Sequence, residues 1–453
     1  MMVAAVDGGR ACPLPARVIV AGGGLAGLAS AAALGQAGYD VDVFESRAFP
    51  GGRATSYPLQ DEVIDNCQHV LLRCCTSLLD FYARLGMTDA IKFHRAFHFV
   101  EPGGRVSTLE RGRLPAPLHF TGSFLGLDFL TLREKIAVGA AMAAMMIEHR
   151  TRTDLDRITM LDWLREKRQP ERAISRYWNQ VLVSAINEDL DRMAASHGFQ
   201  VFVQGFLGSR DAYEMGIPSV PLAELYSERA WRERVPGVRF HFRTPVEHMG
   251  AEGVIAGGRT WTADAYVCAL PFERVNAVVP DARLDFDGWQ HSPITGIHLW
   301  FDREVTDLPH ATLLDRTIQW FFNKSGGRYL QAVVSASRSL VEMPRQEVID
   351  LAVRELGEFL PAVRGARLEK AHVVKEVRAT FSAVPGLERP PAESRVPRLF
   401  FAGDWTRTGW PATMEGAVRG GYLAAEAIQR SLQSNLWPPP PGSTSELSRR
   451  GRS

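Results

Sequence analysis

Cysteine is scarce in this chain. The 453 residues include five cysteines, Cys12, Cys67, Cys74, Cys75 and Cys268, and no two of them form a C-x-x-C pair. A sparse and odd-numbered set favours neither a disulfide framework nor a zinc site. We therefore expect no metal, and a reducing cytoplasm is the predicted location.

The chain also lacks an excess of charge of either sign. Lysine and arginine number 52 against 51 aspartate and glutamate, which leaves a net charge of +1. Without a basic surplus there is no electrostatic case for nucleic acid, and we expect no such partner. The first fifteen residues have no basic stretch followed by an apolar core, so no secretory signal is predicted. Residues 1–15 and 433–453 are expected to be flexible tails.

Long hydrophobic runs are missing as well. The most apolar run, Ile136 to Ile147, has twelve residues, whereas a helix needs about 20 residues to span a bilayer. The run predicts a buried helix of a second domain. The alternative is a helix that contacts lipid at a membrane surface.

The beginning of the sequence has the pattern of a βαβ unit. Arg17 to Ala21 is a short β-branched run, Leu25 to Gly38 is rich in Ala and Leu and ends on glycine, and Asp40 to Glu45 alternates like a strand. Such a unit has parallel strands joined by a helix.

The rest of the chain changes character twice. From about His98 to Tyr226 the spacing of apolar residues is helical, with several Trp and Met, which predicts an inserted domain. Strand-like segments then follow at 238–246, 259–270, 293–301 and 398–402, and a last amphipathic helix is predicted over 412–432.

A G-x-G-x-x-G motif stands where the first strand meets the first helix. Its glycines are Gly22, Gly24 and Gly27, and Glu45 ends the second strand. The glycines allow backbone N–H groups to approach a pyrophosphate at the helix N-terminus, and the carboxylate can accept hydrogen bonds from a ribose. The sequence therefore predicts a dinucleotide site.

Two further motifs indicate FAD as the cofactor. Gly51-Gly52-Arg53 follows the second strand, and Phe401-Ala402-Gly403-Asp404 lies far downstream. Together with the fingerprint they resemble the flavin amine oxidase and carotenoid desaturase superfamily. The resemblance implies that Arg53 supports the diphosphate, that Asp404 holds the ribityl chain, and that the helix N-terminus around Met414 and Glu415 faces the flavin. Glu415 is expected to cap that helix, because an acid in the first turn complements its dipole.

The resemblance sets the expected fold and cofactor contacts. We expect an α/β fold in which a Rossmann-type FAD-binding domain (16–97, 230–290 and 380–432) carries an inserted helical or mixed α+β substrate domain (98–229 and 291–379). The residues expected at FAD are Gly22, Gly24, Leu25, Ala26, Gly27, Glu45, Ser46, Gly52, Arg53, Val246, Gly403, Asp404, Pro411, Ala412, Thr413 and Met414.

Two strings narrow the family. Ile64 to Leu72 (IDNCQHVLL) and Gly403 to Gly416 (GDWTRTGWPATMEG) are similar to the hydroxysqualene dehydroxylases, a squalene-associated FAD-dependent group of bacterial hopanoid pathways. The resemblance implies replacement of C–OH by C–H in a C30 isoprenoid to give squalene, with hydride from reduced FAD. The electron donor is expected to be a separate reductase or NADPH. An apolar tunnel between His98 and Tyr226 would bind the substrate, and peripheral contact with the inner face of the cytoplasmic membrane is expected.

The same segment supplies the candidate acids and a departure from the family pattern. Loss of a hydroxyl needs a proton donor, and Asp65 and His69 are the predicted catalytic residues. Cys67 stands where the family pattern has glycine, and Arg73 stands where a small residue follows the leucines. A side chain at position 67 would cost strain if the backbone there needs a positive φ.

Three other functions remain open. A carotenoid-type desaturase would move the hydride from a C–C bond to oxidised FAD and needs no leaving-group acid. A flavin amine oxidase would need an aromatic cage, for which Trp405, Trp410 and Phe381 are candidates. A flavin-bound scaffold in a lipid-synthesis assembly would not turn over isoprenoids at all. Fold alone does not separate these functions.

Overall fold

The computed structural model describes residues 15–436 of the chain, and the side chains of residues 15–432. Cys12 and nearly all of the two expected tails lie outside this part. The last helix, α12 (Met414–Leu436), runs four residues into the segment expected to be a tail.

A parallel sheet of five strands forms one half of the molecule. Its order is β10-β2-β1-β14-β20, and every neighbouring pair is parallel. The strands are β1 (Arg17–Ala21), β2 (Asp40–Phe44), β10 (Val238–His241), β14 (Ala265–Cys268) and β20 (Leu399–Phe401). Helix α1 (Leu25–Gln36) joins β1 to β2 and packs on the sheet through fully buried residues such as Leu28 and Leu34. The predicted βαβ unit is therefore confirmed.

The predicted strand over 238–246 is two strands in different sheets. β10 adds to the parallel sheet, and β11 (Val246–Gly250) begins a three-stranded antiparallel sheet with β12 (Gly253–Ala256) and β13 (Arg259–Trp261). Between them the chain turns at Arg243, which has a φ of 54°. The sequence does not reveal this turn, because apolar and polar residues alternate both before and after it.

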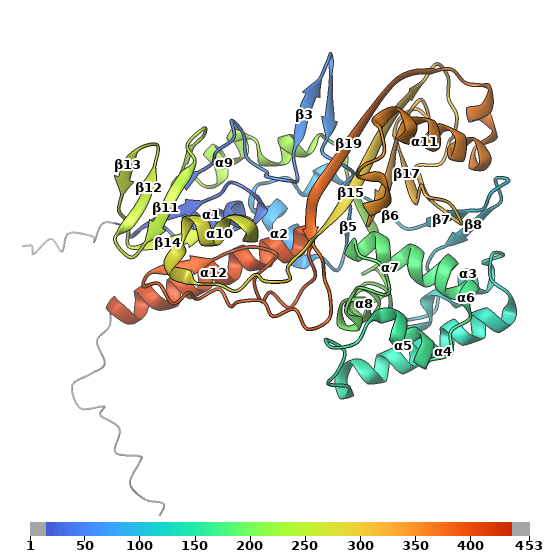
Figure 1. Ribbon diagram of the computed structural model, residues 1–453, viewed down its shortest axis with the longest axis horizontal. Helices are drawn as coiled ribbons and strands as arrows, with labels where there is room; N and C mark the ends of the chain where they lie inside the picture. Colours follow the sequence, from blue (N-terminus) through green and yellow to red (C-terminus); the bar gives the residue numbers. More distant parts are fainter. Residues whose placement is uncertain (1–14, 437–453) are drawn as a thin grey trace, which may run out of the picture.

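A seven-stranded mixed sheet forms the other half (Figure 1). Its order is β19-β15-β18-β17-β16-β7-β8. The strands are β7 (Phe97–Val100), β8 (Val106–Leu109), β15 (His291–Phe301), β16 (His310–Leu313), β17 (Trp320–Ser325), β18 (Tyr329–Ser335) and β19 (Leu368–Phe381). The long strands β15 and β19 pair over almost their full length and run from this sheet back to the parallel sheet (Figure 1). Helix α11 (Arg345–Phe359) covers one face of the sheet.

The segment expected to be helical contains strands at both ends. β7 and β8 open it, and β9 (Met215–Pro218) closes it by pairing with β5 (Leu71–Leu72) and β6 (Ile91–His94). The helices between them are α3 (Thr121–Leu125), α4 (Leu132–Thr151), α5 (Met160–Glu166), α6 (Glu171–Ala173), α7 (Asn179–Ile186) and α8 (Ala195–Gln200). The strands were missed because four-residue apolar segments fit either period.

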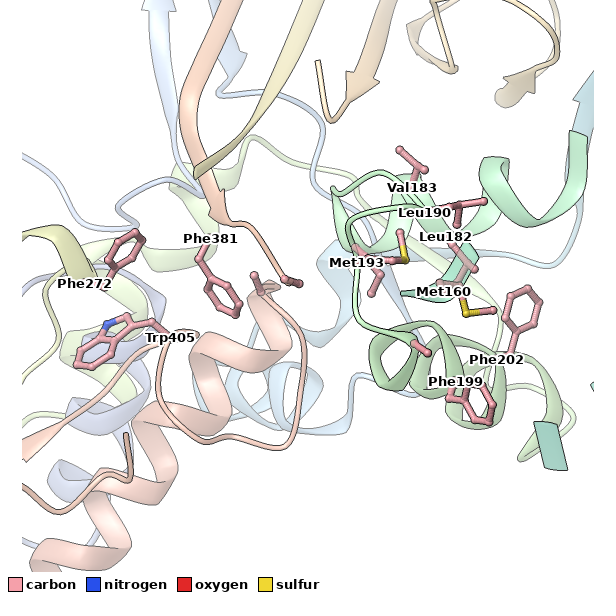
Figure 2. Close-up of a cluster of buried hydrophobic side chains, with 14 of the residues drawn as sticks. Met160, Leu182, Val183, Leu190, Met193, Phe199, Phe202, Phe272, Phe381 and Trp405 are labelled. Atoms are coloured by element: carbon pink, nitrogen blue, oxygen red, sulfur yellow. The ribbon is translucent and has the colours of Figure 1, made fainter. Parts of the chain in front are cut away.

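The Met and Trp residues of this region are mostly core. Met160 and Met193 are buried among Leu182, Phe199 and Phe202 (Figure 2). Core packing also crosses one of the predicted domain boundaries: Leu222, Leu225 and Tyr226, placed in the substrate domain by sequence, pack in the core of the parallel sheet. The boundaries themselves stay predictions.

Helix α4 contains the most apolar run of the sequence. Val138, Ala141 and Met145 are buried, whereas Leu132, Ile136 and Ile147 are exposed. The expectation of a buried helix therefore holds for one face only. Within residues 15–436, no helix is both long and apolar enough to cross a membrane.

Helices α1 and α12 come from opposite ends of the chain and pack with their backbones in contact. A Cβ at Gly421 would overlap the carbonyl oxygen of Ala26 and lie 2.9 Å from the Cβ of Ala29. The Ser30 hydroxyl donates to the Gly421 carbonyl at 2.8 Å. Only glycine at position 421 permits this approach.

Gly421→Ala is expected to lower the free energy of unfolding by about 1–3 kcal/mol, because the added methyl group forces the two helices apart. Thermal and urea unfolding would measure the change. Gly139→Ala in α4 is the matched control: a Cβ there meets no atom within 4 Å, so improved helix propensity should leave stability equal or higher. Equal stability of the Gly421 variant would contradict the packing argument.

Candidate functional site

A cavity of about 480 Å³ opens at the carboxyl edge of the parallel sheet. Gly22 follows β1, Glu45 follows β2, Ala269 follows β14, and Gly403 comes two residues after β20; all four line the cavity. Ligands of open α/β sheets bind at this edge, where the connections diverge. The cavity is therefore the candidate dinucleotide site.

The N-terminus of α1 faces this cavity. Gly24 is the N-cap residue, no side chain caps the first N–H groups, and Gly24, Leu25 and Ala26 line the cavity. Uncapped N–H groups at a helix N-terminus attract a phosphate. Gly27 does not line the cavity, and its contact with FAD stays a prediction. A Cβ there would overlap the carbonyl oxygen of Gly22, so the turn itself needs this glycine.

Glu45 is held in place at the end of β2. One of its carboxylate oxygens accepts the N–H of Gly23 at 2.8 Å, and the other accepts the N–H of Arg47 at 2.7 Å and the hydroxyl of Ser46 at 3.0 Å. Glu45 and Ser46 both line the cavity. The carboxylate is thus fixed where the sequence places the ribose.

Arg53 joins the two ends of the sequence. Its guanidinium lies 3.2 Å from the Asp404 carboxylate and donates to the carbonyl of Ala379 at 2.6 Å. Gly52, Arg53, Gly403 and Asp404 line the cavity together. The two motifs that indicate FAD therefore meet, although they are separated by about 350 residues.

The N-terminus of α12 forms another part of the cavity wall. Ala412, Thr413 and Met414 line the cavity, as does Val246. Pro411 lines a neighbouring apolar cavity described below, and its contact with FAD stays a prediction.

Glu415 caps a helix other than its own. Its carboxylate accepts the N–H groups of Ser77 at 3.1 Å and Leu78 at 2.7 Å, in the first turn of α2 (Thr76–Arg84). Burial raises the pKa of this carboxyl group. Glu415 also lies in the first turn of α12, as expected, so its carboxylate lies at the N-terminal ends of two helices.

Cys67 has a left-handed backbone with a φ of 57°. The family pattern has glycine at this position, and a side chain at positive φ costs about 1 kcal/mol or more. Gly296 on β15 makes room for the Cys67 side chain, because a Cβ at position 296 would lie only 3.4 Å from the Cys67 Sγ. Burial raises the pKa of the Cys67 thiol to about 12, so the group is a neutral thiol at pH 7 and no nucleophile.

The structure separates the two predicted acids. His69 lines the cavity, and its Nδ1 has no hydrogen-bond partner among the described residues. Burial lowers the pKa of His69, so the ring is neutral near pH 7.

Asp65 does not line the cavity, and its role as an acid stays a prediction. It accepts the Ser56 hydroxyl at 2.7 Å and the N–H of Leu222 at 3.0 Å, and Lys324 lies 3.3 Å away. These contacts tie the hairpin of β3 (Ser56–Leu59) and β4 (Glu62–Asp65) to its neighbours. A buried carboxylate takes the nearest donors, which here are structural.

Several wall residues were not predicted. They include Asn66, Gln68, Ser184, Ala185, Asn187, Leu270, Arg274, Ile294, Glu376, Ala379 and Thr380. Asn187 has a φ of 60° and donates to the Ser292 carbonyl and to the Thr380 hydroxyl, both at 2.9 Å. The loop after β14 could have been found from the rule that ligands bind at carboxyl edges; the residues of α7, β15 and β19 depend on long-range packing.

A second, apolar cavity of about 230 Å³ adjoins the first. Gln68, Val70, Ser184, Ala185, Ile294, Thr413 and Met414 line both. The remaining wall includes Leu71, Leu72, Phe97, Phe99, Phe206, Trp320 and Phe322. In residues 15–432, no cluster of three or more His, Cys, Asp or Glu side chains could hold a metal ion.

Comparison with known proteins identifies the family. Residues 25–429 match the model of the family described as flavin containing amine oxidoreductase. The chain belongs to this family.

The relatives of this flavin-containing oxidoreductase include carotenoid desaturases. It is 27% identical to the 15-cis-phytoene desaturase of Synechococcus elongatus, over 91% of this chain and 95% of the relative. It is 24% identical to the zeta-carotene desaturase of Synechocystis, over 91% and 97%. The solved structure of cyclohexylamine oxidase from Brevibacterium oxydans is 19% identical, covers 92% of this chain and 100% of its own, and has a TM-score of 0.67. The last match shows the shared fold.

The cavity of this flavin-containing oxidoreductase fits FAD. The uncapped N-terminus of α1 suits the diphosphate, the fixed Glu45 carboxylate suits the ribose, and Arg53 with Asp404 suits the chain between diphosphate and ring. When bound, FAD supplies two-electron hydride chemistry. Family membership and the cavity therefore agree on this cofactor.

Glu45→Gln is expected to weaken retention of FAD by about tenfold or more, because a neutral amide is a poorer acceptor for a ribose hydroxyl than a carboxylate. The flavin absorbance that remains after gel filtration measures this. Glu252→Gln, on the exposed turn before β12, is the charge-matched control. Wild-type retention in the Glu45 variant would remove the ribose assignment.

The Cys67 thiol is expected to resist alkylation in the folded protein. With a pKa of about 12, its thiolate fraction should rise about tenfold per pH unit from pH 7 to 10 without a plateau. Peptide mapping after iodoacetamide treatment would follow the rate, and urea-unfolded protein, which should level off near pH 9, is the control. A plateau near pH 9 in the folded protein would contradict the burial argument.

Proposed function

We propose that this flavin-containing oxidoreductase acts on a long isoprenoid chain as a carotenoid-type desaturase. The observation that carries the proposal is the apolar cavity that shares a wall with the flavin cavity. A hydrocarbon in the second cavity would lie beside the cofactor in the first. Burial of its apolar surface, at about 25 cal/mol per Å², would supply the binding energy.

Several polar groups in the wall of the apolar cavity already have hydrogen-bond partners within the protein. The indole of Trp320 donates to the Ser184 hydroxyl at 2.7 Å, and the Thr312 hydroxyl lies 3.2 Å from the Gln180 amide oxygen. The Glu415 carboxylate caps α2. Since these groups are already satisfied, a polar substrate would gain little from them and a hydrocarbon would leave none unpaired.

The candidate acids near the flavin cavity support oxidation of the substrate over reduction. Desaturation takes a hydride from one carbon and a proton from the next, forms a double bond between them, and requires no acid for a leaving group. Asp65 lines neither cavity, and His69 is neutral because burial lowers its pKa. This arrangement, with the desaturase relatives, supports oxidation of the hydrocarbon. An electron acceptor must then complete the cycle.

Reductive dehydroxylation of hydroxysqualene to squalene is the second candidate. It is favoured by the D-N-C-Q-H string, which contributes Gln68 to the shared wall and His69 to the flavin cavity. In this reaction the His69 ring would donate the proton to the leaving hydroxyl, and a reductase or NADPH would supply electrons.

An amine oxidase has less support. Phe381 contacts Trp289, Trp405 contacts Phe286 and Phe401, and Trp410 lines the apolar cavity. Trp405 lines the flavin cavity, Trp410 lines the apolar cavity and Phe381 lines neither, so the three rings do not surround one space.

An anaerobic single-turnover experiment separates the two candidates. Desaturation predicts that the oxidised protein bleaches with a phytoene-type or squalene-type hydrocarbon and that a product with a new double bond is extracted. Dehydroxylation predicts that dithionite-reduced protein is reoxidised by hydroxysqualene and yields squalene. If the oxidised protein does not bleach and the reduced protein is not reoxidised, although FAD is bound stoichiometrically, both reactions are contradicted and the scaffold is favoured.

His69→Gln sharpens the result. A desaturase should keep most of its bleaching rate in this variant, because no leaving-group acid is needed. A dehydroxylase should lose about 100-fold or more in the rate of reoxidation with flavin still bound. Asp65→Asn is the matched control, since Asp65 lies outside the cavity.

A further inference from the structure

Helix α4 has an apolar face that is exposed. Leu132, Ile136 and Ile147 are 66%, 65% and 66% exposed. Ala140 and Ala143 lie between them on the same side, because these five positions are spaced by three and four residues. A soluble helix normally has polar residues on its outer face, so this α4 face (Leu132, Ile136, Ala140, Ala143 and Ile147) requires a partner.

The exposed charged residues of α4 are both positive. The exposed residues of α4 include Arg133 and Arg150 and no acid. The two acids of the helix are engaged elsewhere: Glu134 accepts the N–H of Thr131 at 2.7 Å, and Glu148 accepts the indole N–H of Trp163 at 2.7 Å. Neither Arg133 nor Arg150 has an ion-pair partner in the described part of the chain.

The preceding segment extends the apolar surface. Leu114, Leu118 and Leu125 are exposed large side chains on the segment that ends with α3. The Lys135 ammonium donates to the Leu125 carbonyl at 2.6 Å, which fixes the end of α3 beside the first turn of α4. The end of α3, with Leu125, thus lies beside the first turn of α4 in the helical half of the molecule, the part formed by α3 to α8 (Figure 1).

We propose that the α4 face and these leucines dock on the surface of an anionic lipid bilayer. An apolar face with arginines at both ends of the helix fits a helix that lies in the interface, with its side chains among the acyl chains and its cations at the phosphates. A helix of 20 residues offers about 30 Å of contact. A second copy of the chain fits less well, since a two-fold contact would place arginines against arginines with no acid between them.

The docking region lies one side-chain layer from the apolar cavity. Phe120 and Phe124, on the inner side of the same segment, contact Phe206 and Tyr177 at ring distances of 6.0 and 5.6 Å, and Phe206 lines the cavity. This step rests on the proposed isoprenoid substrate: a hydrocarbon dissolved in the bilayer would pass to the cavity without crossing water.

Flotation of the FAD-loaded protein with vesicles tests the docking without any substrate. The wild type should float with phosphatidylcholine vesicles that contain phosphatidylglycerol and bind pure phosphatidylcholine less. The triple variant Leu132→Gln/Ile136→Gln/Ile147→Gln should lose about tenfold or more of this binding. Arg133→Gln/Arg150→Gln should remove the preference for the anionic vesicles.

A control triple variant separates this surface from general hydrophobicity. Val63, Val377 and Ile255 are 55%, 48% and 36% exposed and lie outside the helical half, so their replacement by Gln should leave flotation unchanged. Wild-type protein that stays at the bottom, or equal flotation of both triple variants, would overturn the proposal. So would a dimer in light scattering that only the α4 triple variant abolishes. Because bleaching by substrate in detergent should be normal in the α4 variant, failure of the docking and failure of the proposed reaction are distinguishable.

Discussion

The flavin cavity depends on the contact between α1 and α12. These helices come from the two ends of the chain, and each presents its N-terminus to the cavity: Gly24 to Ala26 from one, Thr413 and Met414 from the other. Their separation is set by the absence of a side chain at Gly421. Two positive helix ends that face one space make an anion site that neither end could make alone. The salt bridge between Arg53 and Asp404 also connects the N-terminal and C-terminal parts of the chain at the cavity.

The second cavity has few polar groups that are free to bind a ligand. The Ser184 and Thr312 hydroxyls are bonded to other groups of the wall, and the carboxylate in the wall, Glu415, has the N–H groups of a helix as partners. Selectivity for a hydrocarbon can arise in this way, because a polar group that is already paired forms no new hydrogen bond to compensate a polar ligand for its loss of water. The chemistry is then decided at the shared wall, where Gln68, Thr413 and Met414 face both spaces.

The sequence predicted those parts of the molecule in which structure is local. The βαβ unit, Glu45, Arg53 and Asp404 follow from motifs whose residues are fixed by a turn or a strand end. The failures have a common physical cause. Asp65 lies in the predicted segment, but its carboxylate is turned by Ser56 and Leu222, and Leu222 is about 157 residues distant. Likewise Ser184 and Thr380 reach the cavity only because α7 and β19 pack against it, and no period in the sequence records such a meeting.

The cysteine at position 67, where the family pattern has glycine, allowed a correct prediction about the backbone. The missing glycine predicted strain if φ were positive, and φ is 57°. The compensating glycine lies on another strand, Gly296 of β15. The space left by the missing side chain at Gly296 is thus filled by the side chain of Cys67. A motif that covers only one of the two positions does not record this pairing.

The paired strands β15 and β19 have a mechanical consequence. They run from the seven-stranded sheet to the wall of the flavin cavity, and their pairing is regular from Ile294 to Trp300, with a register shift between Ser292 and Ile294. Bending within the regular stretch would break several ladder hydrogen bonds at once, so the two strands resist a hinge there. A ligand is therefore admitted more readily by displacement of the helices α3 to α8 than by a bend in this stretch.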